Sequence, residues 1–135
     1  MTSNLPRAAQ RDATDLDRAE VIATFFHGLS DAKRVRILEL LAERPRTVTE
    51  LVGEMEIAQG RLSSHLACLR WCGYVMAIQE GRFSRYMLVD GRVRQILRLG
   101  EAIVRDNADR LNSCLVLATE DAGAVPKVND FEVTG

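Results

Sequence analysis

The sequence lacks any long hydrophobic run. No apolar stretch among its 135 residues approaches the roughly 18 needed to cross a bilayer. Residues 1–15 are polar and also lack the apolar segment of a secretion signal. We therefore expect a cytoplasmic protein with no membrane partner. In that reducing compartment, the three cysteines point to metal or redox chemistry rather than to structural disulfides.

Catalytic machinery is missing from the sequence pattern as well. There is no glycine-rich phosphate loop. His65 and Cys68 lie three residues apart, but nothing in the pattern supplies an orienting acid or an oxyanion donor. We therefore predict that the protein is not an enzyme. Internal repeats are also absent, and a hydrophobic content of 47% predicts a single domain with a modest core that dimerisation would complete.

The apolar periodicity predicts a domain at residues 16–119, between a flexible arm at 1–15 and a disordered tail at 120–135. Its first helix should cover residues 16–29 and bury an apolar stripe. His27 on that helix is interpreted as a partly buried structural residue. The stripe consists of Val21, Ile22, Phe25, Phe26 and Leu29.

Two capping signals predict the next helices. Ser30 is suited to cap a second helix at residues 31–43, which ends before Pro45. Thr47 with Glu50 three residues later forms a capping box, which predicts a short third helix ending near Met55.

The stretch 57–75 is the one around which the other elements are arranged. Leu62, Leu66 and Leu69 recur at i, i+4 and i+7, which predicts one buried helical stripe that ends at Gly73. We expect Trp71 to pack at the end of this helix. Together with the third helix and the tight turn between them, it makes a helix-turn-helix pair. Its outer face carries no carboxylate and consists of Gln59, Arg61, Ser63, Ser64 and His65.

After this helix the period changes to that of strands. Residues 74–79 and 83–89 read as two strands joined by Glu80-Gly81-Arg82, a β-hairpin signal. Arg82 at the tip and Arg85 on the second strand should reach DNA phosphates. Residues 57–89 include four arginines and only one glutamate, although the whole chain has a net charge of −1. This local basic charge fits a nucleic-acid face, and an ordinary solvated surface is the alternative interpretation.

The polar helix face suits entry into a DNA groove. Gln and Arg side chains form bidentate contacts with bases, and Ser and His donate to phosphates or base edges. A last helix is predicted at residues 93–118, with an apolar stripe longer than a small core needs, which indicates a dimer interface. The predicted fold is mainly α with a small β-hairpin: a winged helix-turn-helix with a long C-terminal dimerisation helix.

Cys68 and Cys72 are separated by one helical turn and therefore lie on one helix face. Thiolates are soft donors that select soft metal ions over magnesium, calcium or manganese. Two alternatives remain open. Both residues could be small buried apolar side chains, or they could form a thiol redox switch. The switch requires the helix end to unwind, because an i, i+4 disulfide fits a regular helix poorly.

Three of these segments resemble the ArsR/SmtB family of bacterial metal-responsive repressors, over roughly residues 21–117. HGLSDAKRVRILELL is similar to that family's second helix, TVTELVGEMEIAQGRLSSHLACLRWCGYV to its helix-turn-helix, and EGRFSRYML to its wing. Within the family, SSHLACLRWCG most resembles the cadmium/lead sensors of the CmtR type. The resemblance implies metal-binding cysteines at Cys68 and Cys72, and by position a third at Cys114.

Two other metal sites of that family are missing: TELVGE has no Cys-x-Cys pair, and residues 93–118 contain no histidine. A three-thiolate site suits Cd(II), Pb(II) or Hg(II), whereas zinc would need a water or a histidine as well. The resemblance also implies a homodimer, formed through the first and last helices, that binds palindromic double-stranded operator DNA without metal. The soft ion would act as the inducer and release resistance genes from repression.

Two alternatives to this function stay open. One is a winged-helix repressor that senses oxidants or sulfide through its thiols. The other is a protein-interaction module with ordinary core cysteines.

Overall fold

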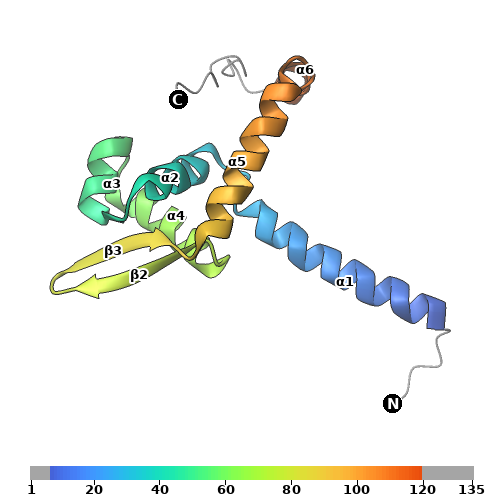
Figure 1. The fold of residues 1–135 in the computed structure, drawn as a ribbon, viewed down its shortest axis with the longest axis horizontal. Helices are drawn as coiled ribbons and strands as arrows, with labels where there is room; N and C mark the ends of the chain where they lie inside the picture. The colour runs from blue at the N-terminus through green and yellow to red at the C-terminus, as the bar shows by residue number, and fades with distance from the viewer. Residues whose placement is uncertain (1–6, 120–135) are drawn as a thin grey trace. The chain divides into compact units, whose positions relative to one another are not determined.

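The computed structural model describes residues 7–119, and the side chains of residues 15–113. The chain forms two compact units, residues 1–90 and 91–135. The predicted tail at 120–135 and the first six residues of the predicted arm lie outside the described residues. The first unit contains α1 (Arg7–His27), α2 (Ala32–Glu43), β1 (Arg46–Thr47), α3 (Val48–Met55), α4 (Gln59–Trp71), β2 (Val75–Glu80) and β3 (Phe83–Leu88) (Figure 1).

The helix-turn-helix of α3 and α4 begins with the predicted capping box. The Thr47 hydroxyl accepts a hydrogen bond from the Glu50 N–H at 3.2 Å, and the Glu50 carboxylate accepts one from the Thr47 N–H. α3 ends at Glu56, whose left-handed backbone (φ 53°) turns the chain toward α4. These local bonds satisfy backbone groups that a helix end otherwise leaves without a partner.

α4 also ends where the sequence predicts. Gly73 has a φ of +88°, which is accessible to glycine at little cost. The Gly73 N–H donates to the Arg70 carbonyl at 3.1 Å and the Tyr74 N–H to the Leu69 carbonyl at 2.9 Å. This pair of bonds is a Schellman cap, and it fixes the exit of the chain into β2.

The core of the first unit lies among α2, α3, α4 and the sheet. Burying one large apolar side chain contributes roughly 1.5–3 kcal/mol, so these contacts hold α4 firmly in place. The predicted leucine stripe of α4 is confirmed as part of this core. The largest fully buried side chains are Ile37, Leu38, Leu51, Leu62, Leu66, Leu69 and Tyr74.

The hairpin is confirmed, and it belongs to a three-stranded antiparallel sheet in the order β1-β3-β2. Its register pairs Glu80 with Phe83 across a tight turn in which Gly81 has a φ of +60°. The short β1 was not expected. β1 contains the buried Arg46. The guanidinium of Arg46 donates to the Leu40 carbonyl at 3.0 Å and forms ion pairs with Glu43 and Glu54.

The region around α1 differs from expectation in three ways. The helix begins at Arg7 rather than near Leu16. The predicted burial of its stripe is wrong for the single chain, because Val21 is 70% exposed and Phe26 is 51% exposed. Asp31, rather than Ser30, caps α2: its carboxylate accepts from two N–H groups at 2.8 and 3.1 Å. The Ser30 hydroxyl instead donates to the His27 carbonyl at 2.7 Å.

Two side chains expected to pack are exposed instead. His27 lies on the surface at the end of α1, where its ring is 3.4 Å from the Ser30 hydroxyl. Trp71 is 92% exposed, so it does not pack at the end of α4 within this chain.

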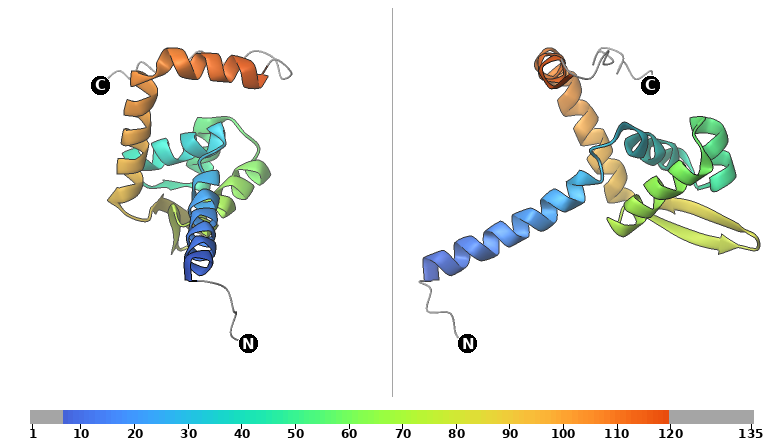
Figure 2. Two further views of the ribbon diagram at one scale, coloured as in Figure 1. Left: turned by 90° about the vertical axis from the view of Figure 1, so that its right-hand side faces the viewer. Right: turned by 180° about the vertical axis from the view of Figure 1, so that it is seen from behind.

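The second unit contains α5 (Gly91–Asp106) and α6 (Ala108–Thr119), not one continuous helix (Figure 2). The break falls at Asn107, whose side-chain amide donates to the Ile103 carbonyl at 2.9 Å. The Ile103 carbonyl also accepts from the Asn107 N–H at 3.1 Å, so it is shared between the backbone and the side chain of the residue at the break. No helix within residues 7–119 is long and apolar enough to span a membrane.

Candidate nucleic-acid interface and thiol pair

The predicted DNA-reading residues occupy the first two turns or so of α4. Because Leu62 and Leu66 are buried, the other faces of these turns point to solvent. Gln59, Arg61, Ser63 and Ser64 are exposed, and His65 is half-buried. The Ser64 hydroxyl donates to the Gly60 carbonyl at 3.2 Å. The structure thus brings all five predicted polar residues together on one rigid element.

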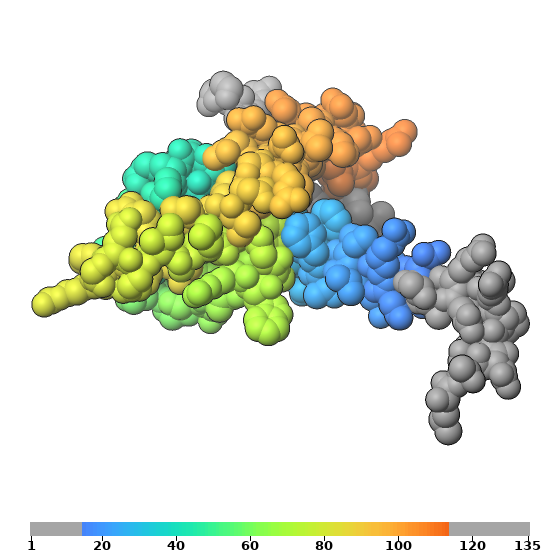
Figure 3. Space-filling model, turned by 60° about the horizontal axis from the view of Figure 1, so that its bottom comes forward, coloured from blue at the N-terminus to red at the C-terminus, as the bar shows by residue number. Residues whose placement is uncertain are grey.

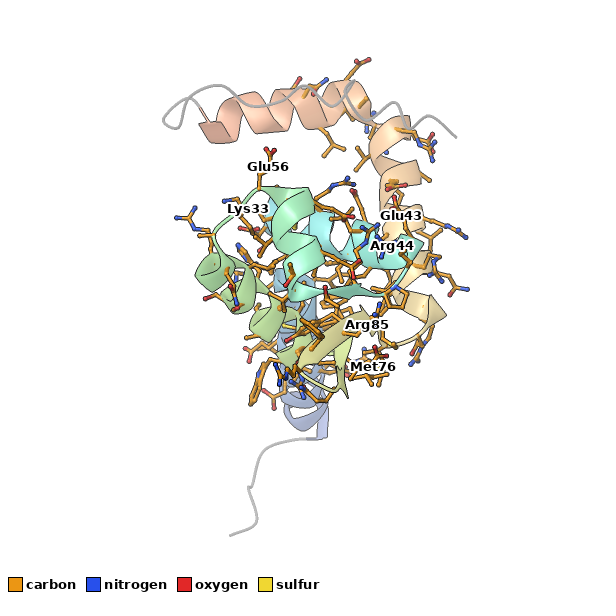
Figure 4. The ribbon with its side chains drawn as sticks, turned by 90° about the vertical axis from the view of Figure 1, so that its left-hand side faces the viewer. Lys33, Glu43, Arg44, Glu56, Met76 and Arg85 are labelled. Atoms are coloured by element: carbon orange, nitrogen blue, oxygen red, sulfur yellow. The ribbon has the colours of Figure 1, made fainter. Side chains whose placement is uncertain are left out.

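Arg61 and His65 also line an open pocket of about 410 Å³ at the start of α2. Its other lining residues are Asp31, Ala32 and Lys33, which the sequence patterns did not single out. Lys33, labelled in Figure 4, lies on α2 and adds a second cation to this rim. Only the folded structure brings the start of α2 beside α4, so local spacing carried no signal for Lys33.

The charge of Asp31 in this pocket is stabilised by its surroundings. Burial alone would raise the pKa of its carboxyl. Hydrogen bonds from the N–H groups of Arg34 and Lys33, together with the positive charge of His65, outweigh burial and hold that pKa below its usual value. Asp31 therefore stays ionised at neutral pH, where it caps α2 and faces His65.

The predicted wing arginines differ in their surroundings. Arg82 is exposed in the hairpin turn between β2 and β3. The hairpin forms the yellow finger that protrudes on the left of Figure 3. The Arg85 guanidinium, labelled in Figure 4, donates to the Glu80 carboxylate at 3.0 Å. Exposed ion pairs of this kind contribute little to stability, so Arg85 can exchange its partner for a phosphate at small cost.

Cys68 and Cys72 form a pair of free, half-buried thiols at the C-terminal end of α4. Burial raises the pKa of the Cys72 thiol, and the neighbouring Cys68 raises it further through its charge and a hydrogen bond between the two thiols. The positive charge of Arg34 acts in the opposite direction. The two thiols therefore lie close enough to influence one another, as the i, i+4 spacing predicted.

This pair offers a metal ion two soft donors and no more. Among the described side chains, no group of three or more His, Cys, Asp or Glu residues is arranged to hold a metal. Cys114 belongs to α6, but its side chain lies outside the described residues. The described side chains thus supply two ligands to a thiophilic ion. Any third ligand has to come from outside the described side chains.

Comparison with known proteins identifies the family. Residues 31–77 match the family described as "Bacterial regulatory protein, arsR family". The chain is 38% identical over 95 residues to a probable mercury resistance operon repressor of Streptomyces lividans, a match covering 70% of this chain and 76% of that protein. The chain belongs to the ArsR/SmtB family. It is accordingly a DNA-binding transcriptional repressor, not an enzyme.

Two further similarities support this assignment. The regulator CmtR of Mycobacterium tuberculosis (strain H37Rv) is 35% identical over 80 residues, which cover 59% of this chain and 68% of CmtR. The crystal structure of Rv0081 from M. tuberculosis superposes with a TM-score of 0.64 at 33% identity, over 69% of this chain and 95% of that one. The predicted winged helix-turn-helix is thereby confirmed.

Proposed function

We propose that this ArsR/SmtB protein is a metal-responsive repressor of the cytoplasm. Without metal, its homodimer binds a palindromic operator. A soft ion, Cd(II), Pb(II) or Hg(II), then binds Cys68, Cys72 and Cys114 and releases the DNA, which derepresses resistance genes. The observation that carries the proposal is the composition of α4: polar side chains suited to DNA occupy its first turns, and two half-buried thiols one helical turn apart lie at its C-terminal end.

Sequence reading is assigned to the first turns of α4. Gln59 and Arg61 are suited to bidentate base contacts, whereas Ser63, Ser64 and His65 donate to phosphates or base edges. Arg82 and Arg85 hold the wing on the DNA backbone and carry little sequence information. Two such helices in a dimer enter successive major grooves about one helical turn apart, which requires a palindromic site.

Exposed apolar side chains support the homodimer. α1 exposes a set of them, and α5 exposes another. Contiguous apolar surface on a protein of this size indicates an interaction site. We assign both surfaces to a second copy of the chain, through its first and last helices. The residues concerned are Leu16, Val21, Ile22 and Phe26 on α1, and Leu99 and Ile103 on α5.

The thiol pair supports the choice of inducer. Sulfur donors select soft cations, and only deprotonated thiols bind them, so the affinity should rise with pH. By linkage, an ion that weakens DNA binding is itself bound more weakly by the DNA-bound dimer, typically by about 1–3 kcal/mol. The described residues hold the ion through Cys68 and Cys72, and Cys114 is proposed as the third donor, from the same chain or from the partner.

The test is a titration of anaerobic, fully reduced full-length protein with Cd(II), and separately with Hg(II), followed by thiolate-to-metal charge-transfer absorbance. We expect saturation at one ion per protomer in the wild type and loss of the band in Cys72→Ser. Cys114→Ser should give a weaker band. A wild type without a saturable band would overturn the metal proposal and leave the DNA-binding fold intact.

The contact between the thiols also favours a second candidate, a repressor that senses oxidants or sulfide. Cys72 is the C-cap residue of α4, so a disulfide would require this helix end to unwind. Peroxide and Cd(II), added separately to reduced protein on operator DNA, distinguish the candidates. Release by Cd(II) alone supports metal sensing, and release by peroxide alone supports the thiol switch. A suitable operator duplex can be selected by the apo protein from a random DNA library.

A further inference from the structure

The sulfur of Cys72 contacts more than its partner thiol. Gly28 lies buried in the corner between α1 and α2. A Cβ atom at Gly28 would stand 3.4 Å from the Cys72 sulfur and only 2.9 Å from Cε2 of Tyr74. The second distance is shorter than real Cβ contacts allow. A glycine is needed here because the tyrosine ring and the cysteine sulfur pack directly against the backbone of the corner.

Tyr74 joins the end of α4 to the end of α1. Its side chain is fully buried, and its ring stacks on Phe25 with 4.4 Å between the centroids. Its hydroxyl donates to the Phe25 carbonyl at 2.7 Å. The Phe25 carbonyl also accepts from the Gly28 N–H at 3.1 Å, so the bond from Tyr74 adds a side-chain anchor that joins the end of α1 to a residue two positions beyond Cys72.

Arg34 of α2 fixes the same corner from the other side. Its guanidinium donates to the Gly28 carbonyl at 2.8 Å and to the His27 carbonyl at 3.2 Å. The last carbonyls of α1 are therefore held by side chains from α2 and from the residue before β2, in addition to Ser30, whose hydroxyl donates to the His27 carbonyl at 2.7 Å. A shift of Tyr74 relative to Arg34 would change the direction in which α1 leaves the corner.

We propose that this corner, made of Phe25, Gly28, Cys72 and Tyr74, transmits ligand binding at Cys72 to the position of α1. The inference rests on the proposed function and adds a route for its regulation. Binding of an ion shared with Cys68 moves the Cys72 sulfur away from Gly28. Protein interiors are close-packed, so the ring of Tyr74 has to follow.

The hydroxyl of Tyr74 passes this movement on to the last turn of α1. The exposed apolar face of α1 is one of the surfaces that we assign to the dimer. A change in the direction of α1 therefore changes the spacing of the two recognition helices, which has to match one helical turn of DNA. Tyr74 is a positioning residue in this scheme, since it binds neither metal nor DNA.

Tyr74→Phe tests the inference in the full-length protein, because it keeps the stacked ring and removes only the hydroxyl. Tyr86→Phe is the matched control: Tyr86 lies on β3 opposite Ala77, in the sheet rather than the corner. Both variants should give the wild-type Cd(II) absorbance band and bind operator DNA without metal. In Tyr74→Phe, the factor by which Cd(II) weakens operator binding should fall about tenfold, within the usual range of coupling. In Tyr86→Phe it should not change.

Hydrogen exchange supplies a second readout, independent of operator binding. Cd(II) should change the protection of the amides in the last turn of α1, and Tyr74→Phe should abolish that change. Wild type that binds Cd(II) with unaltered protection there would overturn the inference. So would a Tyr74→Phe protein that Cd(II) releases from DNA as efficiently as wild type, and in both cases the proposed function survives. Absence of the Cd(II) band in wild type would overturn both.

Discussion

The two halves of α4 share one buried stripe of leucines but differ in everything they expose. The first half presents exposed polar side chains from Gln59 to Ser64. The second half carries two half-buried thiols, and the sulfur of Cys72 lies against the corner between α1 and α2. The buried leucines hold α4 in place, so in the proposed route ligand binding at the thiol end acts on the polar end through α1 and the dimer. One helix can thus carry the residues proposed for recognition and those proposed for sensing, because the two sets of side chains do not overlap.

Truncating the shared leucine stripe should destabilise the fold and so impair both halves of α4. Leu66→Ala deletes a side chain that is 1% exposed, and such truncations cost about 2–5 kcal/mol of folding free energy. Urea denaturation at fixed protein concentration measures the loss. The exposed neighbour Ala67→Ser is the control and should change stability by less than about 0.5 kcal/mol. A Leu66→Ala protein of wild-type stability would contradict the role of the stripe.

Substitution in the first half should separate recognition from sensing. Arg61→Ala removes an exposed bidentate donor, which should weaken operator binding by about 1–3 kcal/mol. The Cd(II) absorbance band should keep its wild-type intensity and saturation point. Fluorescence anisotropy with the selected operator measures the first quantity. Arg36→Ala, on α2 and paired with Glu39, is a matched control that should bind DNA normally. Equal losses in both variants would mean that only total charge matters.

The wing should contribute less, and in a different way. Arg82→Ala should lower the salt dependence of operator binding, because each phosphate contact adds about 0.9 to the slope of log K against log salt. Affinity for a scrambled duplex should fall by the same factor as affinity for the operator. Binding isotherms at four salt concentrations measure both effects. An unchanged slope would show that Arg82 does not touch the DNA backbone.

Elements with local signals could be predicted from the sequence. The leucine spacing and Gly73 define α4, Thr47 with Glu50 defines the start of α3, and Glu80-Gly81-Arg82 defines the hairpin turn. Each of these signals acts over a few residues, so the surrounding fold could not override it. The contact between Cys68 and Cys72 follows from helix geometry in the same way.

Features that depend on distant contacts could not be predicted. The stripe on α1 correctly indicates an apolar face. Periodicity alone does not indicate whether that face packs inside its own chain, and in the single chain Val21 is exposed. The break at Asn107 was missed because the apolar period continues on both sides of it. Gly28 and Tyr74 gave no signal, since their packing arises only when the chain has folded.

We propose that Cys72 controls DNA release without taking part in DNA binding. The operator affinity of reduced wild type and of Cys72→Ser, each with and without one equivalent of Cd(II) per protomer, tests this role. Without metal, the two affinities should be equal. Cd(II) should weaken wild-type binding by about 5–150-fold and leave binding by the variant unchanged. A Cys72→Ser protein that Cd(II) releases as readily as wild type would contradict this role of Cys72.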